Sequence, residues 1–369
     1  MLKRVSIQNF KSLKNVTLEL QKVNLLIGPN NSGKTNFLKA LEFFDFSVLH
    51  DDLAGERQAK NIRFKRSANS MCIELTFQRE DEELIFLRGF YFSSETNVES
   101  SQRNLKEGHE QAKNDQGYSD ASFLSRQLNS LKIYRPDPNK ITHPGIVGTG
   151  EEVVNADASN IVGFLDLMLG KYRRTVFRRI ETDINICIPE FNEIKIEDAL
   201  QITEELRKMF GDRTFKRIGL TNSEQDITYW ADELSEGTLY FVALLCIINQ
   251  PNPPKLLLLE EPEKGIHPRR IWEVMKFIFQ LAEEKDVQII LTTHNEHVVN
   301  AFSSMPESVF VFDKDEETGA TTVRNLQENI IKISHKKSEE LGQKKIDFTS
   351  NLGERWMYGL IGGVPADEL

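Results

Sequence analysis

The chain has 369 residues, of which 39% are hydrophobic and 28% are charged, with a formal net charge of −10. This composition predicts a soluble globular protein and excludes wholesale disorder, and no apolar run reaches the roughly 18 residues of a membrane span. The negative net charge argues against a protein that coats nucleic acid with a generally basic surface. The absence of any CxxC pair argues against a zinc site and favours a reducing cytoplasm.

The first part of the chain predicts strands followed by a helix. Residues 2–7 and 16–20 alternate between apolar and polar side chains, which predicts two strands of a small ladder. VNLLIG (23–28) is a short apolar run ending in glycine, which is typical of a buried strand. The stretch KTNFLKALEFFDF then has large apolar residues at helical spacing: Phe37, Leu38, Leu41 and Phe44.

The middle of the chain is more varied. SMCIELTFQRE and ELIFLRGFYF alternate and predict a hairpin. Residues 93–120 are rich in Ser, Asn, Glu and Gln, which predicts an exposed excursion or a mobile loop. LKIYRPDP predicts a strand stopped by prolines, and residues 151–215 indicate mainly helices.

The last third alternates strands and helices, which indicates an α/β fold. A helix is expected to begin near Ser235, and KLLLLEEPE and VQIILTTHN are predicted to be buried strands on either side of an amphipathic helix. SVFVFDKDEETGATTVRNL predicts a hairpin with its turn at residues 317–319, and a basic helical stretch and LGERWMYGLIGGVP follow.

GPNNSGKT fits the phosphate-loop pattern GxxxxGK[ST], after a predicted strand and at the start of a predicted helix. Glycines let the backbone wrap a phosphate, so that successive N–H groups and the helix N-terminus face the anion. Lys34 would reach the β- and γ-phosphates, and the hydroxyl of Thr35 would bind Mg²⁺. The alternative is an ordinary glycine-rich turn. The expected ATP-binding residues are Gly28, Pro29, Asn30, Asn31, Ser32, Gly33, Lys34, Thr35 and Asn36.

In LLLLEEPEKGIHP, a buried strand ends in acids at the sheet edge where α/β proteins bind ligands. Glu260 would face the Mg²⁺ shell, and Glu261 would orient or deprotonate a water molecule. An apolar strand that ends in acids is common, so this pattern indicates a nucleotide site only in combination with the phosphate loop.

Two further motifs have a structural alternative. In LSEGT, Ser235 and Gly237 could cap a helix or present a hydroxyl and N–H groups to a phosphate. In LTTHN, His294 ends a buried strand, where a histidine is usually only hydrogen-bonded.

In this order, GPNNSGKT, LSEGT, LLLLEEPEKGIHP and LTTHN resemble the motifs of ABC-type ATPases of the SMC/RecF/OLD-like branch. The likeness is greatest to standalone AAA/ABC ATPases of bacterial defence or DNA-maintenance systems, and IQNFKSLKN and LGERWMYGLIGG resemble the same group. The resemblance implies an α/β P-loop NTPase of ABC type, with a mixed or parallel sheet, an antiparallel β subdomain and a helical lobe.

The resemblance also implies roles for single residues. Ser235 and Gly237 match the signature motif, which acts in trans on the γ-phosphate held by a second subunit. Glu260 matches a metal-shell position that is usually aspartate, and together with Thr35 it would hold the metal. The expected catalytic residues are Glu261, His294 and Lys34. The D-loop matches Gly265, His267 and Pro268, whereas the glutamine-loop residue stays open between Gln78 and the segment Tyr134 to Asp137.

The expected organisation is a single discontinuous ABC-type ATPase domain over residues 1–369. Residues 1–92 would form an N-terminal ATPase lobe with the phosphate loop. Residues 93–225 would form an inserted, mainly helical lobe with a flexible stretch at 93–120. Residues 226–369 would form a C-terminal ATPase lobe with the signature, Walker B, D-loop and switch histidine.

The resemblance implies a cytoplasmic switch that uses ATP and Mg²⁺ and dimerises head to tail, as a homodimer or a higher homo-oligomer. Its hydrolysis would control an effector, such as a separately encoded nuclease, in anti-phage defence. The alternative is a DNA-repair or DNA-maintenance ATPase that binds DNA directly. A transporter's nucleotide-binding subunit is the weakest hypothesis, and no membrane partner is expected.

A basic stretch, KYRRTVFRR, is a candidate DNA or partner patch: Lys171, Arg173, Arg174, Arg178 and Arg179. On an α-helix, Lys171, Arg174 and Arg178 would share one face. The alternative is a solvated helix face in an acidic protein. Other candidates are residues 63–66 and 332–345. A nuclease activity of the chain's own is not expected, because Asp313 and Asp315 fall in a predicted hairpin instead of a Toprim domain.

Overall fold

The computed structural model describes residues 1–49, 52–66, 70–92, 98–106, 109–110, 116–128, 131–199, 213–264 and 266–364. The chain forms two compact units. The first unit comprises Met1–Ile133, Lys255–Glu261 and Leu281–Leu369, and the second comprises Tyr134–Pro254 and Pro262–Gln280. This division differs from the segments 1–92, 93–225 and 226–369, since residues on both sides of position 225 share the second unit.

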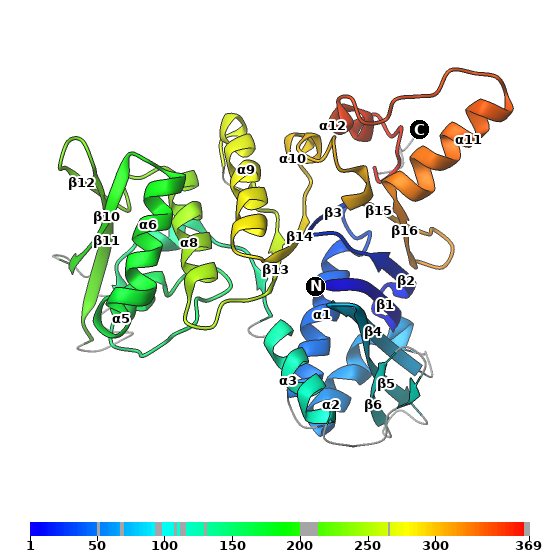
Figure 1. The fold of residues 1–369 in the computed structure, drawn as a ribbon, viewed down its shortest axis with the longest axis horizontal. Coiled ribbons are helices and arrows are strands. Elements are labelled where there is room, and N and C mark those ends of the chain that lie inside the picture. The colour runs from blue at the N-terminus through cyan, green and yellow to red at the C-terminus, as the bar shows by residue number, and fades with distance from the viewer. Residues whose placement is uncertain are drawn as a thin grey trace. The chain divides into compact units, whose positions relative to one another are not determined.

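A six-stranded sheet of mixed direction forms the centre of the first unit, in the order β16-β15-β3-β14-β13-β8 (Figure 1). Parallel pairs join β15 to β3, β3 to β14 and β14 to β13, whereas β16 runs antiparallel to β15. All residues of β3 and β14 are buried, as expected for strands inside a parallel sheet. The bounds are β3 (Val23–Ile27), β8 (Ile133–Tyr134), β13 (Leu256–Glu260), β14 (Gln288–Thr292), β15 (Val309–Lys314) and β16 (Thr321–Asn325).

A second sheet of the first unit is antiparallel, in the order β2-β1-β4-β5-β6-β7. Its strands are β1 (Leu2–Phe10), β2 (Leu13–Glu19), β4 (Ser70–Arg79), β5 (Glu82–Phe92), β6 (Val98–Lys106) and β7 (His109–Glu110). The expectation of a loop at 93–120 is wrong for β6, which pairs along the length of β5, and for β7 and the start of α3 (Gln116–Leu128). The remainder of 93–120 lies outside the described residues.

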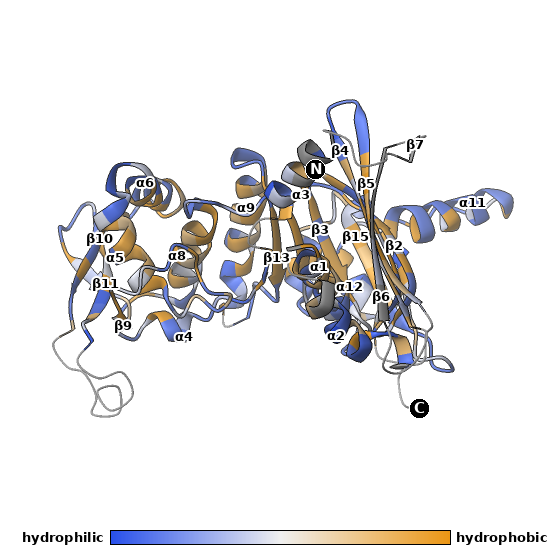
Figure 2. Cartoon of the chain, turned by 90° about the horizontal axis from the view of Figure 1, so that it is seen from below, coloured by the Kyte–Doolittle hydropathy of each residue, from blue (hydrophilic) through white to orange (hydrophobic). Residues whose placement is uncertain are grey.

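Helix α1 (Lys34–Leu49) shares one hydrophobic core with both sheets of the first unit. The predicted apolar positions of α1 are all buried there: Phe37, Leu38, Leu41 and Phe44. Strands β3, β13 and β15 are mostly hydrophobic, whereas α11 is mainly hydrophilic (Figure 2). The other helices of this unit are α2 (Asp52–Ile62), η1 (Phe64–Arg66), α10 (Glu296–Asn300), η3 (Pro306–Ser308), η4 (Leu326–Ile331), α11 (Lys332–Glu340) and α12 (Leu352–Met357).

The second unit combines helices with a four-stranded antiparallel sheet. The described part of 151–215 is mainly helical, as expected, and strand β10 is the element that was not expected there. Strand β11 pairs with β10, β12 and β9. The strands are β9 (Gly145–Ile146), β10 (Phe191–Asp198), β11 (Phe215–Asn222) and β12 (Thr228–Trp230). The helices are α4 (Pro138–Ile141), α5 (Ile161–Lys171), η2 (Arg173–Phe177), α6 (Arg178–Cys187), α8 (Glu236–Asn249) and α9 (Pro268–Glu284), which ends in the first unit.

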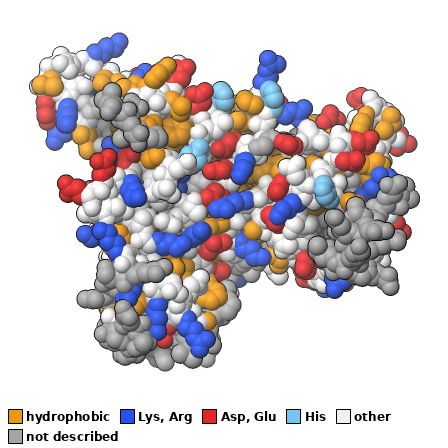
Figure 3. All heavy atoms as spheres, turned by 180° about the vertical axis from the view of Figure 1, so that it is seen from behind, with side chains coloured by type: hydrophobic (Ala, Val, Ile, Leu, Met, Phe, Trp, Pro, Cys, Tyr) orange, Lys and Arg blue, Asp and Glu red, His pale blue; other side chains and the backbone are white. Residues whose placement is uncertain are grey.

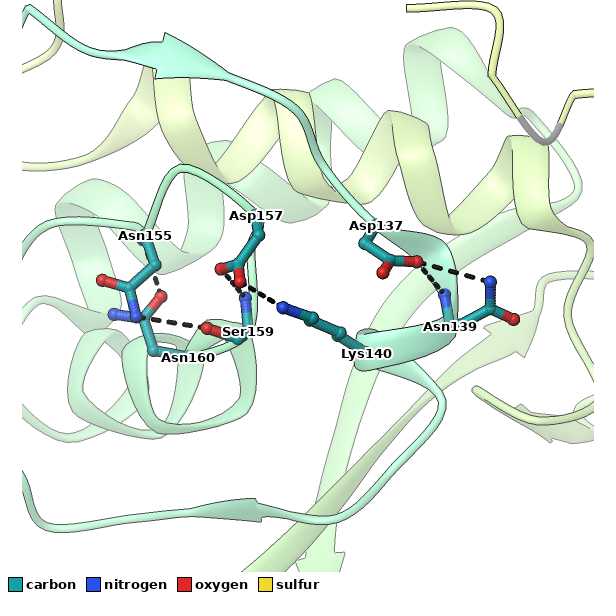
Figure 4. A network of polar contacts seen from close by, with 7 residues as sticks. All are labelled: Asp137, Asn139, Lys140, Asn155, Asp157, Ser159 and Asn160. Atoms are coloured by element: carbon teal, nitrogen blue, oxygen red, sulfur yellow. Dashed lines mark hydrogen bonds and ion pairs between the residues drawn. The ribbon is translucent and has the colours of Figure 1, made fainter.

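A polar network fixes the chain where it enters this sheet-and-helix unit (Figure 4). Asp137 caps α4 by accepting a hydrogen bond from the Asn139 N–H at 3.0 Å. Lys140 pairs with Asp157 at 2.5 Å, and Asp157 also accepts from the Ser159 N–H. Burial opposes ionisation of Asp157, but the hydrogen bonds from Lys140 and Ser159 outweigh it and lower its pKa to about 2. The network therefore ties α4 to the turn before α5.

Candidate functional site

The predicted phosphate loop joins β3 to α1 in the first unit, as its motif requires. Gly28 and Gly33 have φ of 148° and 108°, and Asn31 has φ of 63°. A Cβ on Gly28 would lie 2.2 Å from the carbonyl oxygen of Phe312, and one on Gly33 would lie 2.2 Å from Thr321 Oγ1. Glycine is therefore required at both ends of the turn, for conformation and for space.

Lys34 is held inside the loop. Its Nζ donates to the carbonyl oxygens of Gly28 and Pro29 at 2.8 and 2.9 Å, and the residue is 6% exposed. Burial lowers its pKa to about 8, against the opposing pull of Glu261 and Glu260. A cation that is already desolvated in a ring of carbonyl oxygens can exchange these partners for an anionic phosphate.

The acidic strand ends beside the loop. Parallel pairing places Glu260 opposite Thr292, and Thr35 Oγ1 donates to Glu260 Oε1 at 2.5 Å. The longer side chain, which stands where aspartate is commoner, thus reaches the start of α1. Two oxygen groups, a hydroxyl and a carboxylate, converge at this point.

Glu261 and His294 face each other at the ends of β13 and β14. Glu261 has φ of 49°, and its N–H donates to the Thr292 carbonyl at 3.0 Å. Its Oε1 lies 3.7 Å from His294 Nε2. Burial and, next, the charge of Lys34 lower the pKa of His294, against Glu261 and Glu260, so the imidazole is neutral at neutral pH.

These groups line one pocket of about 460 Å³. Such a volume is of the size that small-molecule sites occupy. The pocket brings together the loop, both glutamates and the histidine: Asn30, Asn31, Gly33, Lys34, Thr35, Asn36, Glu260, Glu261, Thr292 and His294. Of the remaining predicted loop residues, Gly28 and Pro29 line a second pocket, and Ser32 is fully buried.

The rear of the loop is supported by residues that the sequence analysis missed. Ser12 Oγ and Thr321 Oγ1 lie 2.8 Å apart, and Thr321 Oγ1 donates to the Ser32 carbonyl at 2.8 Å. Asn36 donates to Ser12 Oγ at 2.9 Å. The turn after β1 and the start of β16 thereby fix the loop from outside the motif.

The predicted signature residues lie in the second unit. Ser235 caps α8: its Oγ accepts from the Thr238 N–H at 3.2 Å and from Arg270 Nη1 at 3.3 Å. Ser235 and Glu236 are exposed, and α8 is buried from Gly237 onwards. The capping interpretation is therefore correct, and the exposed helix start also remains open to a ligand or partner.

Of the predicted D-loop, His267 and Pro268 are exposed at the start of α9, and Gly265 lies outside the described residues. Gln78 is the penultimate residue of β4, in the antiparallel sheet and not at the pocket, and its side chain donates to the Glu80 carbonyl. The alternative glutamine-loop segment, Tyr134 to Asp137, begins at β8, an edge strand of the sheet that carries the pocket.

The basic patch is exposed but does not form the predicted helix face. The π-helical η2 lies between α5 and α6, so the i, i+3 and i+4 spacing assumed for Lys171, Arg174 and Arg178 does not hold. Lys171 pairs with Glu152, and Arg179 donates to the Asn249 carbonyl. On the face shown in Figure 3, Lys and Arg are interspersed with Asp and Glu.

Within the described residues, no helix is long and apolar enough to cross a membrane.

Comparison with known proteins identifies a family and several relatives. A family model described as "AAA domain, putative AbiEii toxin, Type IV TA system" matches residues 23–300. The energy-coupling factor transporter ATP-binding protein EcfA2 of Clostridium perfringens is 31% identical over 108 residues, or 29% of this chain and 35% of that protein. The cell division ATP-binding protein FtsE of Streptococcus pneumoniae is 26% identical over 102 residues, or 28% and 43% respectively. The matches thus span less than half the length of these relatives.

Two solved structures share the fold. The SMC head domain from Thermotoga maritima has a TM-score of 0.52 at 16% identity, covering 88% of this chain and 98% of that chain. The Smc head domain bound to the C-terminal domain of ScpA, from Pyrococcus furiosus, has a TM-score of 0.50 at 13% identity, covering 93% and 99%. The expected α/β P-loop fold is thereby confirmed, and at these identities the likeness concerns the fold alone.

Proposed function

The chain belongs to this AAA-domain family of ATP-binding proteins, and we propose that it hydrolyses ATP as a switch that closes head to tail with a second copy. One observation carries the proposal: the phosphate loop, the Thr35–Glu260 pair and the Glu261–His294 pair converge on one pocket. An ordinary glycine-rich turn would require neither the two acids nor the buried lysine at this place.

The residues present fit a magnesium ion. Thr35 and Glu260 offer two hard oxygen ligands 2.5 Å apart, and Mg²⁺ in nucleotide sites usually takes one or two protein ligands together with phosphates and waters. When bound, the ion would neutralise charge on the β- and γ-phosphates. Glu260 and Thr35 would hold it.

The chain's own groups account for the reaction. A water oxygen bonds to the γ-phosphorus as the bond from that phosphorus to the bridging oxygen breaks, giving phosphate and ADP. Glu261 orients this water and accepts its proton, and the backbone bond to Thr292 fixes the glutamate. Lys34 donates to the phosphate oxygens, and neutral His294 donates to the γ-phosphate.

A second copy completes the site in this proposal. Ser235 and Gly237 begin a 14-residue helix whose start is exposed, and a helix N-terminus favours an anion. If each copy presents this start to the other's γ-phosphate, the contact is isologous and closes as a two-fold dimer. ATP then favours the closed form, and hydrolysis releases it.

The test is Glu261→Gln. This change keeps the side-chain volume but removes the base, so we expect ATP turnover to fall by about 10²–10⁴-fold with ATP binding retained. The ATP-bound dimer should persist in size-exclusion chromatography with light scattering. Glu283→Gln, an exposed glutamate on α9, is the matched control. Undiminished ATP turnover in the Glu261 variant would show that Glu261 is not the base that accepts the proton of the water.

For the biological role, we propose control of a separate effector, such as a nuclease, in anti-phage defence. The support is the family description, which names a toxin and a TA system. Affinity purification of the tagged chain with the products of neighbouring genes, in ATP and in ADP, tests this role. A partner retained with only one of the two nucleotides supports it, and the same proteins in both, or none, contradict it.

Direct DNA binding is the second candidate, and the exposed Arg173, Arg174 and Arg178 favour it. Phosphate contacts make affinity fall steeply with salt. If DNA is bound through these arginines, replacing all three with alanine should weaken binding and flatten the salt dependence. An unchanged slope would assign them to the solvated surface.

A further inference from the structure

A segment that is far from the phosphate loop in sequence lies beside it in the folded first unit. It comprises α12 and the turn after it, Leu352–Val364, here called the 352–364 segment. Trp356 is 4% exposed, and its Nε1 donates to the Gly363 carbonyl at 2.9 Å. The Gly363 N–H donates to Asp313 Oδ1 of β15 at 2.9 Å, and Arg324 holds the other carboxylate oxygen at 2.7 Å. The segment is thus closed on itself and tied to the central sheet.

Gly363 lies against the first residue of the loop. A Cβ on Gly363 would be 3.4 Å from Gly28 Cα, 3.3 Å from Trp356 Nε1 and 2.7 Å from Val311 Cγ1. On another side, a Cβ on Gly28 would be 2.2 Å from the Phe312 carbonyl oxygen. Gly28 therefore has the β15 backbone and the 352–364 segment as close neighbours.

A displacement of Gly28 would affect nucleotide binding through Lys34. The ammonium of Lys34 is held by the Gly28 and Pro29 carbonyls, so the position of Gly28 sets the resting position of the lysine. The outer side of the segment is open: Met357 and Tyr358 are 56% and 80% exposed. They line a pocket of about 1230 Å³ with Pro29, Asn30 and His294. The buried side contacts the loop and the sheet.

We propose that the 352–364 segment is a positioning element of the ATP site, which sets ATP affinity through Trp356, Gly363 and Gly28. The inference rests on the proposed ATP function. The segment holds the loop with its N–H groups directed at the phosphates before ATP arrives, so the loop does not have to be ordered on binding. The proposed hydrolytic groups, Glu261 and His294, follow other strands, β13 and β14, and neither belongs to the segment.

Two variants and a control test the proposal. Gly363→Ala places a methyl group 2.7 Å from Val311 Cγ1 and in van der Waals contact with Gly28. Trp356→Phe keeps most of the ring but removes its hydrogen bond to Gly363. We expect KM for ATP and the Kd of ATP to rise about tenfold or more in the first variant and about threefold to tenfold in the second. We expect kcat at saturating ATP to fall by a smaller factor than KM rises, because Lys34 is displaced whereas Glu261 and His294 are not substituted.

Gly342→Ala is the matched control. Gly342 also has positive φ, at 63°, but a Cβ there meets nothing within 4 Å, so the variant carries the backbone strain without the contact. It should bind ATP with the affinity of the original chain. If Gly363→Ala does not fold, Trp356→Phe still decides the question.

The outcomes separate this inference from the proposed function. If the unaltered chain fails to bind ATP in calorimetry, the proposed function is wrong and this inference falls with it. If the chain binds ATP and both variants fold, lose thermal stability and keep its Kd, the segment is structural only and the inference alone is overturned. A Kd that rises by a larger factor than kcat falls in Trp356→Phe supports it.

Discussion

The length of Glu260 is open to a direct test. Aspartate is the commoner residue in the resembling family, and Glu260→Asp retracts the carboxylate by about one C–C bond, 1.5 Å. The present Oε1 lies 2.5 Å from Thr35 Oγ1. Since β13 is paired with β14 up to Thr292, the backbone cannot easily follow, and the separation becomes about 4 Å, beyond hydrogen-bond range.

The expected magnitude follows from that distance. A carboxylate that is retracted from Thr35 is also retracted from the proposed ion, and a charge-assisted contact of about 1.5–3 kcal/mol would be lost there. The Mg²⁺ concentration that half-saturates ATP hydrolysis should therefore rise about 10- to 150-fold in the aspartate variant. Glu260→Gln keeps the side-chain length and removes the charge, so the two variants distinguish the effect of length from the effect of charge. Magnesium titration of phosphate release measures both variants. An aspartate variant with unchanged magnesium dependence would refute the view that the longer side chain is needed at this site.

Two further predictions concern Lys34 and Ser235. Because burial lowers the pKa of Lys34 to about 8, ATP affinity should fall as pH rises through about 8, where the folded chain loses the charge of the lysine. The free energy of unfolding should rise between about pH 8 and 10.5, because in that range the unfolded chain still binds the proton that the folded chain has lost. ATP affinity that calorimetry finds unchanged from about pH 6 to pH 10 would contradict this prediction. Ser235→Ala removes the cap of α8, which should cost about 1 kcal/mol of stability, and it should reduce ATP-dependent dimerisation in light scattering without changing ATP binding by the monomer. Ser235→Asn retains a capping oxygen, so loss of the dimer in that variant as well would show that the serine itself matters and not the cap.

The phosphate loop could be predicted from sequence because its determinants are contiguous. The glycine conformations and the strand–loop–helix order follow from the motif itself. The supports behind the loop could not be predicted in this way. Ser12 and Thr321 are 309 positions apart and meet only because β1, β16 and the loop come together in the folded unit. Thr321 is an unremarkable residue in a strand sequence, and nothing local indicates its contact.

Two errors have physical causes of a different kind. The stretch VESSQRNLK lacks apolar alternation, yet it forms β6 because β5 offers a full strand edge for backbone hydrogen bonds. The shared face predicted for Lys171, Arg174 and Arg178 assumed 3.6 residues per turn, and η2 contains a π-helical turn. Periodicity arguments therefore fail where a neighbouring strand or an irregular turn sets the backbone.

The resting position of Lys34 links the site to its surroundings. Its ammonium is buried against carbonyl oxygens, and that burial disfavours its charge. A phosphate brings full negative charge to the same place, so binding relieves a penalty that the ligand-free loop already bears. Whatever holds Gly28 in place, whether the β15 backbone or Gly363, keeps the lysine in that desolvated position. Affinity for the nucleotide should therefore depend on residues that never touch it.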